Sequence, residues 1–139
     1  MAPRNLTAGE IALAKLIFKN SIDYTKVKVH NGKYIFFQPG NSGMTPNGEI
    51  YANGVYSNDY SRQSTLMKGF LLHEMVHVWQ YQLNILNPVT SAIAENISHG
   101  FDYNRAYVYT LMEGKDLLDY GMEQQAAIVE DYYLVNIAR

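Results

Sequence analysis

Two histidines and a glutamate lie within one five-residue stretch, His73-Glu74-Met75-Val76-His77. The surrounding residues predict a helix, which places His73 and His77 one turn apart on the same face. Two imidazoles at this spacing can bind one Zn²⁺ ion, and Glu74 projects beside the metal, where its carboxylate can take a proton from water. The motif therefore predicts a zinc centre with Glu74 as general base.

The residues around the motif support this interpretation, because apolar side chains surround the helix on nearly every side, as in a buried element. These side chains are Phe70, Leu71, Leu72, Met75, Val76, Val78 and Trp79. A glutamate in such a helix is costly to bury without a partner, and a metal with its water supplies one. The alternative is an amphipathic helix whose histidines fall four apart by chance. Motif and context together favour the metal site.

The third ligand is not contained in the motif, although catalytic zinc usually has three protein ligands and an open position for water. The metzincin pattern would place Gly and His at positions 80 and 83, where this chain has Gln80 and Leu83, so that pattern is excluded. The candidates are Glu95, Glu123 and His99. Glu95 lies near the spacing of the thermolysin-like class, whereas a histidine just before a glycine, as at position 99, is more typical of a helix end.

Glu123 falls in the first turn of a predicted C-terminal helix, where the helix dipole favours a carboxylate. The small Ala126 and Ala127 would let this helix approach the metal helix closely. Glu130 shares the face of Glu123 two turns later, so it is a candidate hydrogen-bond partner for a ligating histidine, with a solvent-facing charge as the alternative. From the residues alone, Glu95 and Glu123 both stay open as the third ligand.

The composition is that of a globular chain: 139 residues, 47% hydrophobic and 17% charged, with no cysteine. We expect one domain, 1–139, without a membrane span. The net charge of −2 and the lack of a basic cluster exclude nucleic acid as an expected partner. The first residues lack the apolar core of a signal peptide. We therefore expect synthesis in the cytoplasm and secretion, if any, by a route that does not read such a signal or as part of a larger polypeptide.

The elements around the motif predict an α+β fold. A capping box of Thr7 and Glu10 opens a helix that runs to about Asn20. The central helix begins at Ser61 or Ser64 and runs to about Leu83. The other expected elements are strands 27–30 and 33–37 joined by an Asn31-Gly32 hairpin turn, a loop 38–43, a short strand 49–51, a helix 89–98, a β-like segment 106–111 and a last helix 122–138.

The order of helix, small antiparallel sheet, metal helix and further helices is that of a minimal zincin. In that layout the edge strand of the sheet lies above the metal and can bind a peptide as an added strand. We expect Glu49-Ile50-Tyr51 or Val55-Tyr56 to be this edge, with Glu49, Ile50 and Tyr51 as substrate-binding residues. Tyr103, Tyr107 and Tyr109 can each donate a hydrogen bond to the oxyanion that forms during peptide hydrolysis. We predict that Tyr107 has this role.

The motifs and their order resemble the small zincin-like metallopeptidase domains found with Rhs and VgrG proteins of type VI secretion systems. More distantly, they are similar to the peptidase-like core domains of extracellular contractile injection systems. The matching segments cover nearly the whole chain and are 6–10, 29–33, 44–51, 73–80 and 123–129. The resemblance implies a gluzincin-like zincin in which Glu123, rather than Glu95, is the third ligand. The chain departs from the thermolysin-like pattern at Ala127, where that pattern has an Asp four residues after the ligating glutamate.

The resemblance further implies a zinc-dependent endopeptidase that acts as an antibacterial effector. A VgrG- or Rhs-type carrier would deliver it into a rival cell, and a cognate immunity protein would neutralise it. In the expected mechanism Zn²⁺ activates water and the scissile carbonyl of a protein substrate, while Glu74 transfers the proton to the leaving amine. Two alternatives are an autoprocessing protease of its own carrier and a non-catalytic, metal-stabilised adaptor on the secretion spike. Glu74 disfavours the adaptor, since a structural metal site needs no general base.

Overall fold

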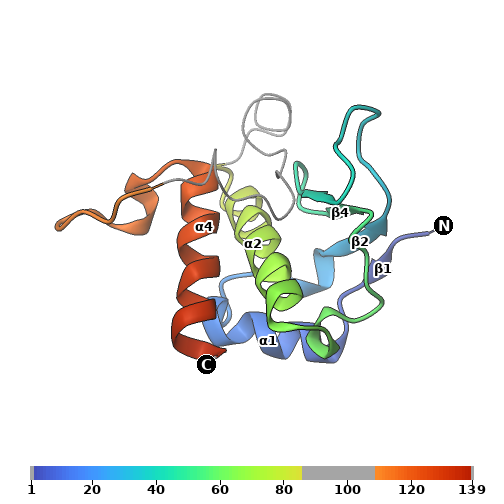
Figure 1. Cartoon of the computed structure of the whole chain (residues 1–139), viewed down its shortest axis with the longest axis horizontal. Coiled ribbons are helices and arrows are strands. Elements are labelled where there is room, and N and C mark those ends of the chain that lie inside the picture. Colours follow the sequence, from blue (N-terminus) through green and yellow to red (C-terminus); the bar gives the residue numbers. More distant parts are fainter. Residues whose placement is uncertain (1, 86–108, 139) are drawn as a thin grey trace.

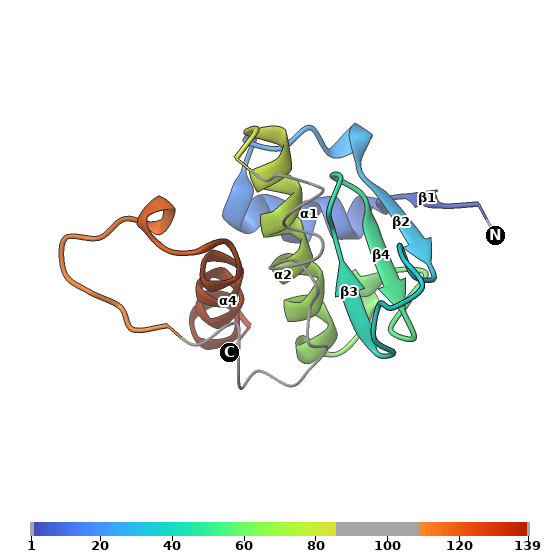
Figure 2. The same cartoon turned by 90° about the horizontal axis from the view of Figure 1, so that it is seen from above.

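The computed structural model describes residues 2–85 and 109–138. The central helix α2 (Thr65–Gln82) lies between the sheet and the C-terminal helix α4 (Met122–Tyr132) in both views (Figures 1 and 2). The helices and strands are β1 (Arg4–Asn5), α1 (Ala8–Phe18), β2 (Lys28–Asn31), β3 (Ser42–Met44), β4 (Ile50–Asn53), α2 (Thr65–Gln82) and α4 (Met122–Tyr132), and a π-helical turn, Tyr133–Ile137, extends α4. The expected α+β class is confirmed. The expected helix 89–98 and residues 106–108 lie outside the described residues, and residues 109–111 are not a strand.

The sheet is mixed, whereas an antiparallel sheet was expected. Its strand order is β1-β2-β4-β3, with β2 and β4 parallel and the other two pairs antiparallel. After β2 the chain leaves the sheet, returns at the far edge as β3, and then enters the middle of the sheet as β4. The short segment 42–44 at this far edge therefore pairs with β4, although the sequence predicted a loop there.

The expected hairpin at Asn31-Gly32 is wrong, because the backbone of Gly32 continues the pairing of β2 with β4. Its N–H donates to the carbonyl oxygen of Ala52 at 3.1 Å. The following residues 33–37 form bends and a turn in place of the expected return strand. Phe36 in this segment is 85% exposed, so its apolar composition reflects a surface loop and not a buried strand.

Helix α1 begins as the sequence predicts. The Thr7 hydroxyl accepts from the Glu10 N–H at 3.1 Å, and Glu10 Oε1 accepts from the Thr7 N–H at 2.9 Å. The Glu10 carboxylate is fully buried and also binds both terminal nitrogens of Arg4 at 2.9 Å and the backbone N–H of Tyr60 at 2.7 Å. One capping residue therefore joins the N-terminus, α1 and the segment before α2.

We expect Glu10→Gln to lower the free energy of unfolding by about 2 kcal/mol, because hydrogen bonds to a charged group are lost and Arg4 stays partly buried without its counter-charge. Urea denaturation followed by circular dichroism measures this change. The control is Glu113→Gln, which alters an exposed glutamate and should shift the free energy by less than about 0.5 kcal/mol. Equal stability of Glu10→Gln and the parent would contradict the role of this carboxylate.

Helix α2 is the centre of the core, as its composition predicts. Ser64 is its N-cap, and the Ser64 hydroxyl accepts from the Met67 N–H at 3.3 Å. Residues 69–78 of α2 are buried. Helix α4 packs against α2 at Gly69, where an added Cβ would lie 3.4 Å from atoms of Glu130 and Leu134. The small residues expected at this contact, Ala126 and Ala127, are buried. No helix among the described residues is long and apolar enough to cross a bilayer.

Candidate metal centre

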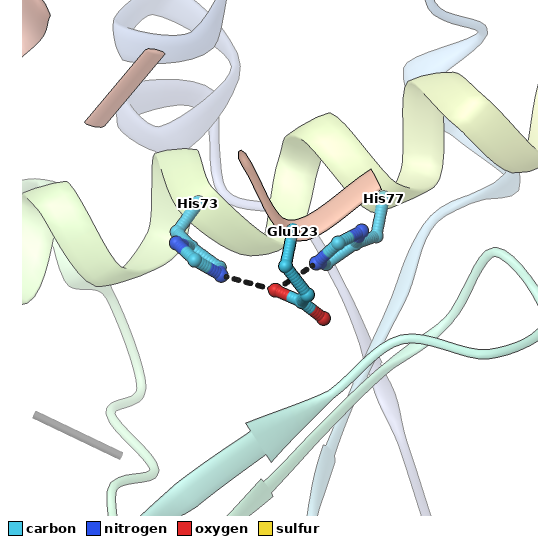
Figure 3. A group of neighbouring side chains, drawn as sticks. All are labelled: His73, His77 and Glu123. Atoms are coloured by element: carbon cyan, nitrogen blue, oxygen red, sulfur yellow. Dashed lines mark hydrogen bonds and ion pairs between the residues drawn. The ribbon is translucent and has the colours of Figure 1, made fainter. Parts of the chain in front are cut away.

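His73 and His77 on α2 face Glu123 in the first turn of α4 (Figure 3). Glu123 Oε1 lies 3.2 Å from Nε2 of each histidine, and one ligand atom of each residue lies within 4.8 Å of the others. In a tetrahedral zinc site with bonds of ~2.0–2.1 Å, neighbouring ligand atoms are roughly 3.3 Å apart. The distances from Glu123 to the histidines therefore match those between ligands of one metal ion.

All three side chains of this cluster are buried, with 5% exposure at most. Burial lowers the pKa of His73, but hydrogen bonds and charge from Glu123 and Glu130 outweigh burial and raise it well above its usual value. At His77, burial is likewise outweighed by Glu123, so its pKa is raised. Burial raises the pKa of the Glu123 carboxyl, yet the two histidines bring it down to about 2. The cluster thus takes up positive charge, which either protons or a metal ion can supply.

Glu130 lies beside His73, with Oε1 at 2.9 Å from Nδ1. A carboxylate only accepts, so His73 Nδ1 donates this hydrogen bond. The other ring nitrogen, Nε2, faces Glu123. The residue singled out in the sequence as a possible partner of a ligating histidine therefore contacts one.

Glu74 faces the sheet instead of α4. Its Oε1 accepts from the Thr45 hydroxyl at 2.7 Å, and burial raises the pKa of its carboxyl. Within the described part of the chain, the buried Oε2 atoms of Glu74 and Glu123 have no hydrogen-bond partner. A buried polar atom without a partner costs ~1–3 kcal/mol, and a metal ion with a water molecule would pair both. The donor set of two imidazoles and a carboxylate therefore fits a zinc ion.

Strand β3 lies against Glu74. A Cβ added at Gly43 would come within 2.6 Å of Phe70 Cζ and 2.8 Å of Glu74 Oε2, which is closer than non-bonded atoms approach. In the described part of the sheet, β3 has one neighbour, β4, and so forms an edge. Figure 2 shows β3 on the side of the sheet nearest α2. Only glycine lets this edge strand approach the motif helix so closely.

We expect Gly43→Ala to destabilise the protein by about 1–3 kcal/mol, because overpacking forces β3 away from Phe70 and Glu74. Thermal or urea denaturation measures the loss. Gly40→Ala is the matched control, since an added Cβ there would meet nothing within 4 Å. If Gly43→Ala were as stable as Gly40→Ala, the close contact of β3 with Phe70 and Glu74 would be contradicted.

The expected edge strands are wrong. Residues 50–53 form β4, which pairs with β2 on one side and β3 on the other, so its backbone cannot accept an added strand. Residues 55–56 form no strand. The side chains of residues 49–51 also have other partners. Glu49 Oε1 lies 2.6 Å from His30 Nε2, and the Tyr51 ring stacks on the His30 ring with centres 4.0 Å apart. Ile50 belongs to the hydrophobic core. Of the two edges in the described part of the sheet, β1 and β3, the one that contacts the motif helix is β3.

The remaining sequence candidates are Glu95, His99, Tyr103 and Tyr107, all of which lie outside the described residues. Tyr109 is described, and its hydroxyl donates to Asp131 Oδ2 at 2.6 Å.

Two residues that contact the site, Thr45 and Gln80, are not among those predicted from the sequence. Thr45 holds Glu74 across elements, and no local sequence signal marks it. Gln80 contacts His77 at 2.7 Å. Its i+3 spacing from His77 could have revealed this contact, since such residues are neighbours on a helix.

Fold and site together define an α+β domain built around a buried His-His-Glu cluster. No protein-family model matches the sequence. The chain is 40% identical over 137 residues to the type VI secretion system spike protein VgrG2b of Pseudomonas aeruginosa, across 96% of this chain and 13% of that protein. It is also similar to the solved effector domain of Pseudomonas aeruginosa VgrG2b, with a TM-score of 0.84 and 37% identity, across 99% of this chain and 76% of that one.

The chain therefore belongs to the family of VgrG2b effector domains. This assignment confirms the expected link to VgrG proteins of type VI secretion. The chain spans about an eighth of the full spike protein that it matches, 13% of its length.

Proposed function

We propose that this chain is a zinc-dependent endopeptidase of the gluzincin-like zincin type that acts as a type VI secretion effector. The observation that carries the proposal is the convergence of His73, His77 and Glu123 around one point (Figure 3). Glu74 lies next to His73 on α2. His73 and His77 would bind the ion through Nε2, and Glu123 through its carboxylate. One Zn²⁺ ion in this site would polarise a scissile carbonyl and lower the pKa of a water molecule.

Glu74 supplies the proton transfers in this proposal. Its Oε1 is held by the Thr45 hydroxyl, which leaves Oε2 as the atom that takes a proton from water and passes it to the leaving amine. The raised pKa of the Glu74 carboxyl suits a group that must hold a proton between these two transfers. Thr45 thus fixes the orientation of the base without taking part in the transfers.

Strand β3 is the proposed substrate-binding element. An edge strand can bind an extended peptide through backbone groups that no second strand pairs with. In the described part of the sheet β3 pairs with β4 alone and contacts Glu74; its residues are buried, and the Ser42 carbonyl oxygen already accepts from the Gln38 amide at 3.3 Å. A peptide paired with β3 would run along the motif helix. Substrate binding through Glu49, Ile50 and Tyr51 is accordingly replaced by pairing with residues 42–44.

The unpartnered oxygen of Glu74 argues against the alternative of a metal-stabilised adaptor. A site that only stabilises the fold gains nothing from a third buried carboxylate beside those of Glu123 and Glu130, because burial of an unpaired oxygen is destabilising. The similarity to part of a secretion spike protein supports delivery by a VgrG-type carrier into a rival cell. An antibacterial protease of this kind also requires a cognate immunity protein in the producing cell.

The test is expression of the parent and of Glu74→Gln in a bacterial host without an immunity gene, once in the cytoplasm and once directed to the periplasm. We expect the parent to stop growth in one compartment and to produce new protein fragments in the proteome. Glu74→Gln should do neither at equal expression. Growth arrest by both proteins would refute a hydrolytic toxin. Cleavage confined to a co-expressed carrier would instead identify an autoprocessing protease.

A further inference from the structure

Gln80 is fully buried on α2, one turn beyond His77, and its side chain contacts three groups. Gln80 Oε1 lies 2.7 Å from His77 Nδ1, and Nε2 lies 3.1 Å from the Met122 carbonyl oxygen and 3.0 Å from Gln125 Oε1. Met122 and Gln125 belong to the first turn of α4, on either side of Glu123. Gln80 therefore joins one candidate ligand on α2 to the turn that carries another.

The neighbours of Gln80 fix the orientation of its amide. The Met122 carbonyl oxygen can only accept, so the Gln80 atom that faces it must be the NH₂ group. The next amide is fixed in the same way, because Gln125 Nε2 donates to the Tyr120 carbonyl oxygen at 2.8 Å, which leaves Gln125 Oε1 facing Gln80. Gln80 Oε1 therefore faces His77 and accepts the proton of Nδ1.

This hydrogen bond decides which nitrogen of His77 is free to bind a metal. Nε2 faces the Glu123 carboxylate, which also accepts a hydrogen bond, so both ring nitrogens donate while the ring is charged. When a metal ion takes the place of one proton, the bond to Gln80 keeps the other proton on Nδ1 and leaves the lone pair of Nε2 for the ion. His73 reaches the same state through a carboxylate, since its Nδ1 donates to Glu130. A neutral amide suits the position beside His77, because Glu74, Glu123 and Glu130 already place three carboxylates in the buried cluster.

We propose that Gln80 is a positioning residue of the metal centre. It holds His77 in the tautomer protonated at Nδ1, and it ties the first turn of α4 to α2. His77 Nε2 and the Glu123 carboxylate are thereby aligned before a metal ion binds. This inference rests on the proposed zinc site and adds to it a residue that touches neither the ion nor the substrate.

The test compares the full chain with Gln80→Met, which keeps the size of the side chain and removes all of its hydrogen bonds. The ¹⁵N NMR spectrum of His77 is recorded without metal, at a pH where the ring is neutral, in a Glu123→Ala background that removes the competing acceptor at Nε2. It should show the Nδ1–H tautomer when Gln80 is present and a mixture when Gln80→Met is added. Zinc affinity, measured by competition with a chromophoric chelator, should fall about 10–100-fold. The control is Gln82→Met, since Gln82 also anchors α2 through its amide, at Asp23, away from the cluster.

An unchanged tautomer together with unchanged zinc affinity in Gln80→Met would overturn the inference. Should Gln80→Met not fold, Gln80→Glu separates the two roles, because a carboxylate accepts from His77 Nδ1 but cannot donate to α4. We expect this variant to keep the tautomer and to bind zinc more weakly; zinc affinity equal to that of the parent would overturn the inference. If the parent binds no zinc while the Glu123→Ala background shows the Nδ1–H tautomer, the proposed function is refuted and the hydrogen bond of Gln80 to His77 stands.

Discussion

Glu74→Gln is expected to lower kcat/KM for peptide hydrolysis by about 10²- to 10⁴-fold, the usual contribution of a general base, while the protein keeps one equivalent of zinc. Glutamine preserves the size of the side chain, and its amide oxygen can still accept from Thr45. What it cannot do is hold the proton between water and the leaving amine. The loss should therefore appear in kcat more than in KM.

The measurement uses zinc-loaded protein and a library of internally quenched peptides as the probe, with metal content determined on the same samples. Glu113→Gln serves as the matched control, because it makes the same chemical change at an exposed site. If Glu74→Gln cleaved as fast as this control with equal zinc content, Glu74 would not be the base. If Glu74→Gln lost its zinc, the motif helix would depend on this carboxylate for more than proton transfer.

Glu123→Ala is expected to reduce zinc affinity by about 10²-fold or more. Structural zinc sites with four ligands have apparent binding free energies of ~10–16 kcal/mol, so one ligand contributes roughly 3 kcal/mol. The loss should be large here because Glu123 contacts both histidines at 3.2 Å. Its removal also leaves Nε2 of both histidines in a buried site without the carboxylate that they share.

Competition with a chelator measures this affinity, and circular dichroism confirms that the variant is folded. Glu123→Gln is a second variant that keeps an oxygen at the same place without its charge, and we expect it to bind zinc more weakly than the parent and more tightly than Glu123→Ala. Glu95→Ala should leave zinc content unchanged. Loss of zinc from Glu95→Ala with retention in Glu123→Ala would transfer the ligand assignment to Glu95.

The starts of α1 and α2 could be predicted from the sequence because local capping residues determine them. Thr7 and Glu10 reciprocally cap α1, and Ser64 caps α2, as their residue types indicate. The sheet could not be predicted, because its pairing is set by contacts between distant segments. Asn31-Gly32 has the residues of a hairpin turn, yet Gly32 pairs with β4. The loop after it is held by Gln38, whose amide bonds to the backbone of Tyr34 and Tyr51.

The candidate metal centre likewise has a part that the sequence predicts and a part that it does not. His73, Glu74 and His77 could be read from the sequence, since helix geometry fixes the arrangement of residues within one turn. Glu123 lies on another helix, and the number of residues between two positions does not give their distance in space. The residues alone therefore leave both Glu123 and Glu95 as candidates for the third ligand. The contact of Thr45 with Glu74 depends on how β3 packs on α2. The sequence contains no pattern for such packing.

Glu123 and Glu130 are both on α4, and both contact His73. The two residues lie two turns apart on one continuous helix, so α4 brings both carboxylates to the cluster together. If zinc binds at the proposed site, it links α2 to α4 and stabilises the folded state in which they are packed together. Each tenfold rise in free zinc above the dissociation constant then adds about 1.4 kcal/mol to the free energy of unfolding. The attachment of the C-terminal helix is then set by the zinc supply of the compartment in which the protein folds.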